Sequence, residues 1–191
     1  MAFGIRQSDR QSHIYIVGQT GTGKSTLLVS LASQDLAAGR GFCFIDPHGD
    51  AAADLARMAR ACDRKDALYW NVADPASPFG YNPLRHVRPE KIPLAVSGLL
   101  DAMRKMWPDA WGTRMEHILR NALYALLERS GSTLADIQRL FADEHFRHEV
   151  AADLTNATVR QFWESEFARY STGYRADGIA PVQNKLGAFL T

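Results

Sequence analysis

Apolar residues in the first 74 positions fall into two kinds of run that alternate along the chain. One kind is short, mainly apolar and rich in β-branched and aromatic side chains, which is typical of buried strands. Three runs of this kind cover residues 13–17, 42–45 and 67–72. The other kind repeats at helical spacing, from Lys24 to a stop at Gly39 and again over 51–61, where Asp50 can cap the helix. This alternation predicts βαβ units and a parallel sheet.

The composition of the chain changes after this part. Five of the eight prolines lie from Pro75 to Pro93, and proline fixes φ and lacks a backbone donor. Residues 75–92 are therefore predicted to form a connector with no regular element. From residue 93 to 191 the apolar positions repeat at helical spacing, which predicts an all-α domain. The expected fold class is α/β, with a partial parallel sheet over residues 1–74 followed by this helical domain.

Local signals mark the ends of several helices in the second part. Thr113 and Glu116 have the spacing of a capping box at the start of one helix. Thr133 with Asp136 is predicted to open the next helix, and Pro181 is placed near the start of the last one. These signals divide the second part into separate helices.

The overall composition is that of a folded globular protein. Hydrophobic residues make up 46% of the 191 positions and charged residues 23%, which excludes a disordered chain. Lys plus Arg number 22 and Asp plus Glu 21, so no global basic excess indicates nucleic-acid binding, although a local loop can still provide it. No apolar run reaches the roughly 18 residues of a membrane span, and the N-terminal segment does not have the pattern of a signal peptide.

The two cysteines bear on the expected compartment. Cys43 and Cys62 are too few for a disulfide framework and are expected to be reduced residues of the core. This cysteine usage, together with the missing signal peptide, predicts a cytoplasmic protein.

A glycine-rich segment directly follows the first predicted strand and has the pattern G-x-x-x-x-G-K-[ST] of a P-loop, the Walker A motif. It consists of Gly18, Gln19, Thr20, Gly21, Thr22, Gly23, Lys24 and Ser25. The backbone amides of such a loop point inward as a nest, and Gly21 and Gly23 permit the dihedral angles that this needs. Lys24 can bridge the β- and γ-phosphates, Ser25 can ligate Mg²⁺ and Thr26 can reach the α-phosphate. The segment predicts nucleotide and magnesium binding, and the lack of an Asn/Thr-Lys-x-Asp guanine-reading segment favours ATP.

A carboxylate at the end of the second predicted strand is the candidate for the rest of the site. Asp46 would emerge at the C-terminal edge of the sheet, where it can hold Mg²⁺ through water or orient the attacking water. A turn or capping role stays open for Asp46, a helix-cap role for Asp50 and a surface role for His48. No later predicted strand ends in Asp or Glu, so a Walker B acid is missing and weak or absent ATP hydrolysis is expected from this chain alone.

Five segments together resemble one family. They read HIYIVGQTGTGKSTLL, GRGFCFIDPHGD, YNPL, WGTRMEHILRNALYALLE and APVQNKLGAFL. The resemblance is to the FtsK/HerA-type P-loop ATPases, specifically the coupling-protein-like ATPases of type IV secretion and conjugation. It covers nearly the whole chain, and the P-loop and FIDPHGD are its strongest motifs.

The resemblance implies a RecA-like P-loop NTPase core with an inserted all-α domain, in a DNA translocase that forms a ring, usually a hexamer, and moves DNA using ATP. By position, Lys24 and Asp46 match catalytic residues, Ser25 and Asp46 match Mg²⁺ residues, and residues 93–190 match the inserted domain. The chain resembles the N-terminal portion of such a motor, with no counterpart of its Walker B strand or arginine finger. The resemblance also allows a cytoplasmic position at the inner face of a membrane, held there by other segments or partners.

Two other functions stay open. A small-molecule P-loop kinase would use the helical part as a lid over its acceptor. A nucleotide-dependent docking or sensing module would instead bind a protein cargo on the helical part, without turnover. DNA-stimulated hydrolysis, phosphoryl transfer to a small molecule, and binding without turnover distinguish the three functions.

Several aromatic and basic side chains allow a structural or a binding interpretation. Three tryptophans at helical spacing are interpreted as core residues rather than base-stacking platforms: Trp107, Trp111 and Trp163. Three arginines are interpreted as solvated helix faces rather than a patch for DNA or a neighbouring subunit: Arg114, Arg120 and Arg129. Arg6 and Arg10 are the candidates to flank the nucleotide base.

Overall fold

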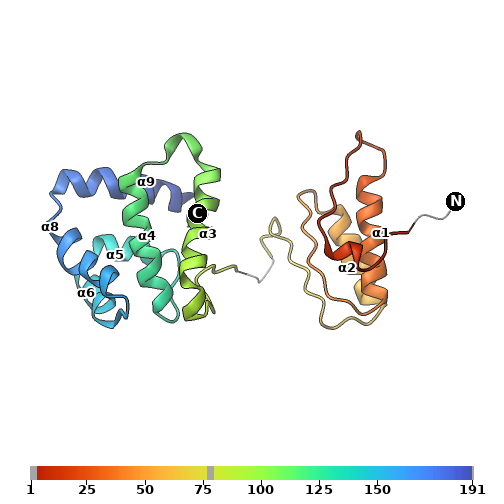
Figure 1. The fold of residues 1–191 in the computed structure, drawn as a ribbon, viewed down its shortest axis with the longest axis horizontal. Helices are drawn as coiled ribbons and strands as arrows, with labels where there is room; N and C mark the ends of the chain where they lie inside the picture. The colour runs from red at the N-terminus through yellow and green to blue at the C-terminus, as the bar shows by residue number, and fades with distance from the viewer. Residues whose placement is uncertain (1–3, 77–79, 191) are drawn as a thin grey trace. The chain divides into compact units, whose positions relative to one another are not determined.

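The computed structural model describes residues 4–76 and 80–190. It divides into two compact units, Met1–Phe79 and Gly80–Thr191, which we call unit 1 and unit 2 (Figure 1). Within the described residues every regular element is helical and none is a strand. The two units differ strongly in how much apolar surface they bury.

Unit 1 is built on two helices that pack against each other, α1 (Lys24–Ala37) and α2 (Asp50–Ala61), after a short 3-10 turn, η1 (Asp9–Gln11) (Figure 1). Both helices lie where the helical spacing predicts them. Gly39, with φ of +73°, provides the predicted stop after α1. Few apolar side chains of this unit are buried among the described residues: Ala32, Leu36, Leu55 and Ala59.

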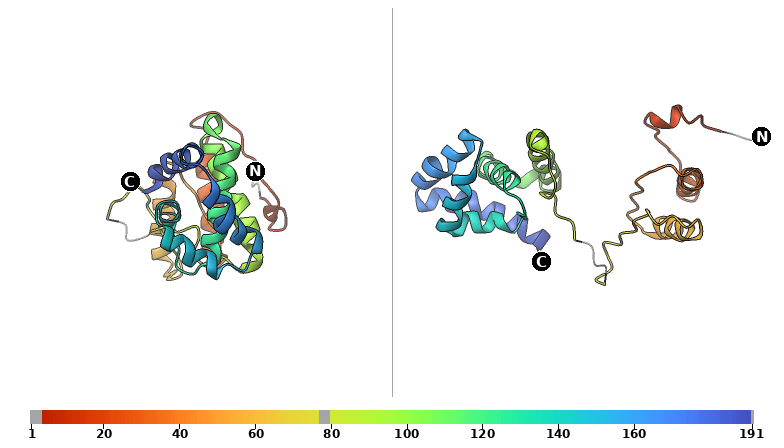
Figure 2. Two further views of the ribbon diagram at one scale, coloured as in Figure 1. Left: turned by 90° about the vertical axis from the view of Figure 1, so that its left-hand side faces the viewer. Right: turned by 90° about the horizontal axis from the view of Figure 1, so that it is seen from below.

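The predicted parallel sheet is absent from the described residues, so the α/β, RecA-like fold class is wrong. The runs that were predicted as strands are residues 13–17, 42–45 and 67–72. They follow extended or turning paths without strand pairing (Figure 2). Their large side chains are exposed, for example Tyr15 at 91%, Ile45 at 87% and Val72 at 77%. Parallel sheets are stable when helices cover both faces, and the described part of unit 1 supplies only α1 and α2 for that purpose.

The two cysteines also differ from the prediction. Cys43 and Cys62 are free and exposed, so their assignment to the core is wrong. Cys43 lies in one of the extended runs and Cys62 is the C-cap residue of α2. Both positions lie outside the small core of unit 1, because that core is confined to the contact between the two helices.

Unit 2 is a bundle of helices in which α4 has the most neighbours (Figure 1). Its elements are η2 (Pro89–Lys91), α3 (Ile92–Met106), η3 (Pro108–Ala110), α4 (Thr113–Glu128), α5 (Asp136–Ala142), α6 (Glu144–Asp153), α7 (Ala157–Gln161), the π-helix η4 (Phe162–Glu166), α8 (Phe167–Arg169) and α9 (Thr172–Leu190). α4 contacts α3, α5, α6, α7 and α9. The connector was predicted to have no regular element, but it contains η2 and packs Leu84 into the core of this unit.

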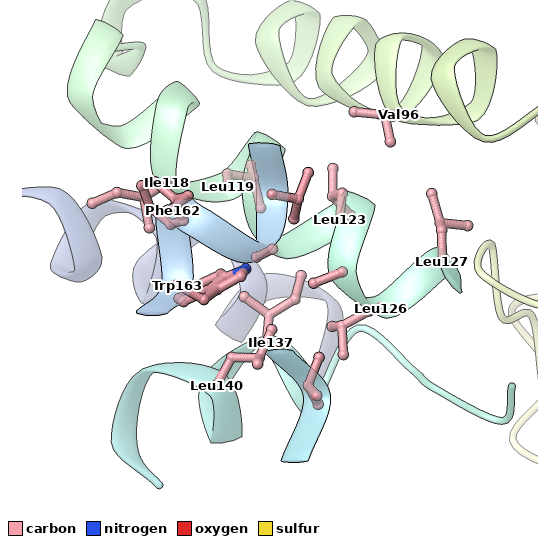
Figure 3. Close-up of a cluster of buried hydrophobic side chains, with 14 of the residues drawn as sticks. Val96, Ile118, Leu119, Leu123, Leu126, Leu127, Ile137, Leu140, Phe162 and Trp163 are labelled. Carbon is pink, nitrogen blue, oxygen red and sulfur yellow. The ribbon is translucent and has the colours of Figure 1, made fainter. Parts of the chain in front are cut away.

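The core of unit 2 surrounds α4 (Figure 3). Ile118, Leu119, Leu123 and Leu126 of this helix are at most 1% exposed. They meet side chains from α3, α5 and η4: Val96, Ile137, Leu140, Phe162 and Trp163. Fully burying one such side chain is worth about 1.5–3 kcal/mol, so this core stabilises unit 2 far more than its few buried residues stabilise unit 1.

The tryptophans of unit 2 belong to this core or pack against it, as predicted. Trp163 is 2% exposed, and Trp107 and Trp111 are partly buried against the core. Trp107 also makes an edge-on contact with Phe189, with ring centroids 5.6 Å apart. These rings are therefore not free platforms for bases.

Two predicted helix signals are wrong. α4 begins at Thr113, but its N-cap is Gly112 and no side chain caps it, so Thr113 and Glu116 do not form a capping box. Glu116 instead accepts a hydrogen bond from the indole nitrogen of Trp111 at 2.6 Å. Pro181 lies well inside α9 rather than near its start.

No helix in residues 4–76 and 80–190 combines the length and the apolar character that a membrane crossing needs.

Candidate functional site

The glycine-rich loop leads from the first extended run into the start of α1. Gly21 and Gly23 have φ of +85° and +86°, a left-handed backbone that glycine adopts at little steric cost. No described atom lies within 4 Å of the position that a Cβ would take at either residue, so the loop is open there. At Gly18 a Cβ would lie 2.6 Å from Thr22 Oγ1. Backbone conformation or close approach therefore accounts for all three glycines of the motif.

The N-terminus of α1 offers unpaired backbone donors. Gly23 is the N-cap and has no side chain that could accept from them, and the first helical hydrogen bond runs from Leu27 N to Gly23 O at 2.9 Å. The amides of Lys24, Ser25 and Thr26 precede that bond and have no acceptor inside the helix. Such donors, together with the positive end of the helix dipole, favour a bound anion such as phosphate.

Lys24 folds back over the loop. Its Nζ donates to the carbonyl oxygens of Gly18 and Gln19, each at 2.7 Å, and Thr22 Oγ1 donates to the Gln19 carbonyl at 2.7 Å. An ammonium group has three N–H bonds, so one remains available after these two contacts. A phosphate oxygen can bind Lys24 through that bond or by replacing a carbonyl. The other residues predicted to bind nucleotide are exposed: Gln19, Thr20, Ser25 and Thr26.

Asp46 lies shortly before α2 and accepts hydrogen bonds from the first turn of this helix. Its Oδ1 accepts from His48 N at 3.0 Å, and its Oδ2 accepts from Ala51 N at 2.9 Å and Ala52 N at 3.1 Å. The backbone N–H of Ala52, followed by that of His48, holds the pKa of Asp46 below its usual value. A carboxylate has about four lone-pair positions, so these bonds leave about one position for a water molecule or Mg²⁺.

Asp46, His48 and Asp50 have different roles in this turn. Asp46 has the capping role, whereas Asp50 is the first residue of α2 rather than its cap, so the helix-cap prediction for Asp50 is wrong. Gly49 is the N-cap with φ of +89°, and His48 is exposed. No group of three or more His, Cys, Asp or Glu side chains in the described residues is arranged to hold a metal. Mg²⁺ is commonly held by one or two protein ligands together with phosphate and water, so this result does not bear on the predicted roles of Ser25 and Asp46.

An arginine near the N-terminus is bound to α1. Arg10 Nη2 donates to Leu31 O at 3.0 Å and forms an ion pair with Asp35. Asp35 also accepts from Arg40 Nε at 2.6 Å. The Arg10 side chain is 11% exposed, so it is held against the helix rather than free to flank a base. These contacts of Arg10 could not be predicted, because ion pairs between distant positions leave no local pattern in the sequence.

Two of the three arginines considered as a basic patch in unit 2 are paired with carboxylates. Arg114 lies 3.2 Å from Asp177, and Arg120 lies 2.7 Å from Glu116. Arg129 has no such carboxylate partner among the described residues and is half-buried. The interpretation of all three as solvated helix faces is therefore wrong for Arg129.

Part of the chain is similar to a curated protein, the type 4 coupling protein DotL of Legionella pneumophila (strain Philadelphia 1). The two sequences are 40% identical over 62 residues, which is 31% of this chain and 8% of DotL. No family model matches the chain. No solved structure matches it either. The similarity supports a relationship to coupling proteins over this stretch.

Proposed function

We propose that this chain binds Mg-ATP on the loop of residues 18–25, as the nucleotide-binding part of a coupling-protein-like ATPase that translocates DNA. One observation carries the proposal: the glycine-rich loop, left-handed at Gly21 and Gly23, ends at the start of α1, which no side chain caps. Such a start presents backbone donors and a positive dipole end to phosphate groups. The similarity to DotL supports the coupling-protein part of the proposal.

The proposal gives each residue of the site a role. Lys24 contacts the β- and γ-phosphates and offsets the negative charge that develops there. The Ser25 hydroxyl and the Asp46 carboxylate hold Mg²⁺, the latter through water, and Thr26 contacts the α-phosphate. Bound Mg²⁺ would itself neutralise phosphate charge. The Asp46 carboxylate is negative at neutral pH, as this role requires, and its backbone hydrogen bonds lower its pKa further.

Hydrolysis and movement of DNA belong to a larger assembly in this proposal. The matched stretch spans 8% of DotL, and the family resemblance implies a ring of copies around the DNA. DNA and neighbouring copies are accordingly the proposed partners, and weak or absent hydrolysis is expected from the 191-residue chain alone.

Isothermal titration of Mg-ATP into this chain tests nucleotide binding, which all three candidate functions share. Lys24→Ala should weaken binding at least tenfold because it removes the cation at the phosphates. Lys65→Ala is the matched control, since Lys65 is also in unit 1, is 86% exposed and lies outside the loop, and it should leave binding within twofold. Equal binding by the wild type and Lys24→Ala would remove the proposal.

Turnover measurements separate the proposed motor from the other functions. Phosphate release that rises on adding DNA, in this chain or a longer one, supports the motor. Transfer of the γ-phosphate to a small acceptor would replace the motor with a kinase. Nucleotide binding with no turnover under any of these conditions would favour a docking or sensing module.

A further inference from the structure

A groove in unit 2 lies between the connector and the C-terminal end of α4. Its volume is about 920 Å³, and it is lined by residues drawn from segments 82–93, 124–132 and 153–156. Its apolar lining includes Leu84, Leu127 and Tyr124, the first two of which are buried. Ligand sites in proteins commonly have this size and this mixture of apolar and polar lining.

Arg129 lines this groove and has no partner for its charge. Its Nη1 is buried without an acceptor, and no carboxylate among the described residues pairs with its guanidinium group. A half-buried cation is costly unless an anion or hydrogen-bond acceptor compensates it. Nη1 itself is closed to solvent, so an acceptor from outside the chain reaches Arg129 through its other two nitrogens.

Two other polar side chains of the groove, Asn82 and Glu128, are already satisfied within the protein. Asn82 donates to Ser132 O at 2.7 Å and accepts from Leu84 N at 3.1 Å. Glu128 Oε2 accepts from both the amide and the hydroxyl of Thr155, at 2.7 and 2.9 Å. By contrast, the guanidinium group of Arg129 offers hydrogen-bond donors that these neighbours do not use.

Two nitrogens of the Arg129 guanidinium group stay available. Only Nη1 is buried without a partner, and Nε and Nη2 make no hydrogen bond within the described residues. The Cζ of Arg129 lies 5.1 Å from the centroid of the Phe146 ring, and Arg139 lies over the same ring at 3.9 Å. Arg139 is already paired with Asp136 at 3.3 Å, whereas Arg129 retains Nε and Nη2 for a carboxylate.

We propose that this groove, which we call the Arg129 groove, binds an extended peptide segment of a partner protein that carries an acidic side chain beside apolar ones. The carboxylate pairs with Nε and Nη2 of Arg129, which match its two oxygens, and the neighbouring apolar side chains pack on the half-buried Val87 and Tyr124. The unpaired charge selects an acidic segment over a neutral one. This inference does not depend on nucleotide binding, because all of its residues belong to unit 2.

Asp153 is a carboxylate that also lines the groove. It is exposed and makes no ion pair with Arg129 in the described structure. Its negative charge opposes an incoming carboxylate. Asp153→Asn should therefore strengthen binding of an acidic peptide by about two- to fivefold, which corresponds to the modest energy of an exposed charge pair.

The test uses the complete chain and two fluorescein-labelled peptides, one with three leucines alternating with two glutamates and one with glutamines in place of the glutamates. The anisotropy should show saturable binding of the glutamate peptide, at least tenfold stronger than that of the glutamine peptide. Arg129→Gln should reduce the affinity at least tenfold and Arg129→Lys by less. Arg88→Gln is the matched control, because it removes a nearby charge that does not line the groove, and should stay within twofold.

Each further outcome supports or overturns the inference. Circular dichroism must show that the variants remain helical. Asp153→Asn should bind more tightly, and a folding defect cannot produce that result because it would weaken binding. Equal binding of the two peptides, or equal binding by Arg129→Gln and the wild type, overturns the inference. Competition by free glutarate as strong as by the peptide also overturns it, because the site would then take a small carboxylate. Lys24→Ala should bind the peptide normally, which separates this result from a failure of the nucleotide proposal.

Discussion

Gly178 in α9 lies against α4 at a point where a methyl group does not fit. A Cβ at this position would lie 2.4 Å from Ile118 Cδ1 and 3.4 Å from Arg114 Cγ. Ile118 is completely buried, so its side chain has neighbours on all sides and little space to move away. Gly178→Ala should therefore force the two helices apart or push Ile118 out of its preferred rotamer.

The expected magnitude combines two opposing effects. Overpacking a core usually costs about 1–3 kcal/mol. Replacing glycine by alanine inside a helix gains about 0.8–1 kcal/mol. Gly98 in α3 provides the second effect alone, because no described atom lies within 4 Å of its Cβ position. We expect Gly98→Ala to stabilise unit 2, and Gly178→Ala to be about 1–3 kcal/mol less stable than Gly98→Ala.

Urea unfolding followed by tryptophan fluorescence measures both variants, because three of the four tryptophans lie in unit 2. Ile118→Val supplies a further comparison. It removes the methyl group that clashes and should cost about 0.5–1.5 kcal/mol in the wild type. In the Gly178→Ala background its cost should shrink or reverse, giving a coupling energy of at least about 0.5 kcal/mol. Additive effects, or a Gly178→Ala variant as stable as Gly98→Ala, would refute the packing argument.

Three further changes test other contacts. Glu116→Gln should lower the stability of unit 2 by about 1–3 kcal/mol. The indole of Trp111 and two arginines lower the pKa of Glu116 from 4.5 to about 2. The contribution of Glu116 to the free energy of unfolding is therefore complete above pH 4.5 and is lost as the pH falls towards 2. Urea unfolding at several pH values measures this loss. Asp46→Asn should weaken the start of α2. Because the pKa of Asp46 is lowered from its usual value of 3.8, the wild type should lose stability as the pH falls below 3.8, and Asp46→Asn should not show this loss. Helicity measured between pH 7 and pH 2 follows both effects. Gly21→Ala should cost about 1–2 kcal/mol from its left-handed backbone and weaken Mg-ATP binding in calorimetry, whereas unchanged affinity would count against the loop geometry.

The helices could be predicted because their signals are local. Apolar spacing predicted α1 and α2 nearly to the residue. The predicted contact of Thr133 with Asp136 is present, since Asp136 accepts from Thr133 N at 2.8 Å, but α5 begins only at Asp136 and its N-cap is Ala135. The capping box at Thr113 failed because a better use of Glu116 existed in the folded chain. Its carboxylate lies beside Trp111 and two arginines, which the spacing alone did not reveal.

The strands were mispredicted because a strand is defined by its neighbour. An apolar run such as residues 42–45 shows that the backbone favours extension, but in the structure this run has no regular element. Pairing also needs a second run in register and cover on both faces, and neither requirement leaves a signal inside the run. The fold class therefore failed at the step from local preference to tertiary packing.

The candidate site was predicted where its chemistry is contiguous. Gly21, Gly23 and Lys24 follow one another in the sequence, so their pattern is visible without a structure. The unpaired state of Arg129 depends on how distant segments meet. Hence the loop could be predicted residue by residue, while the Arg129 groove required the three-dimensional arrangement.

The exposed runs of unit 1 have a consequence for handling the protein. Short apolar segments with unpaired backbone are the kind that stack between molecules into ordered aggregates. Tyr15 and Val72 lie in such segments, and both are largely open to solvent. Self-association should therefore rise steeply with concentration and start in unit 1, leaving the helices of unit 2 intact within the particles that form.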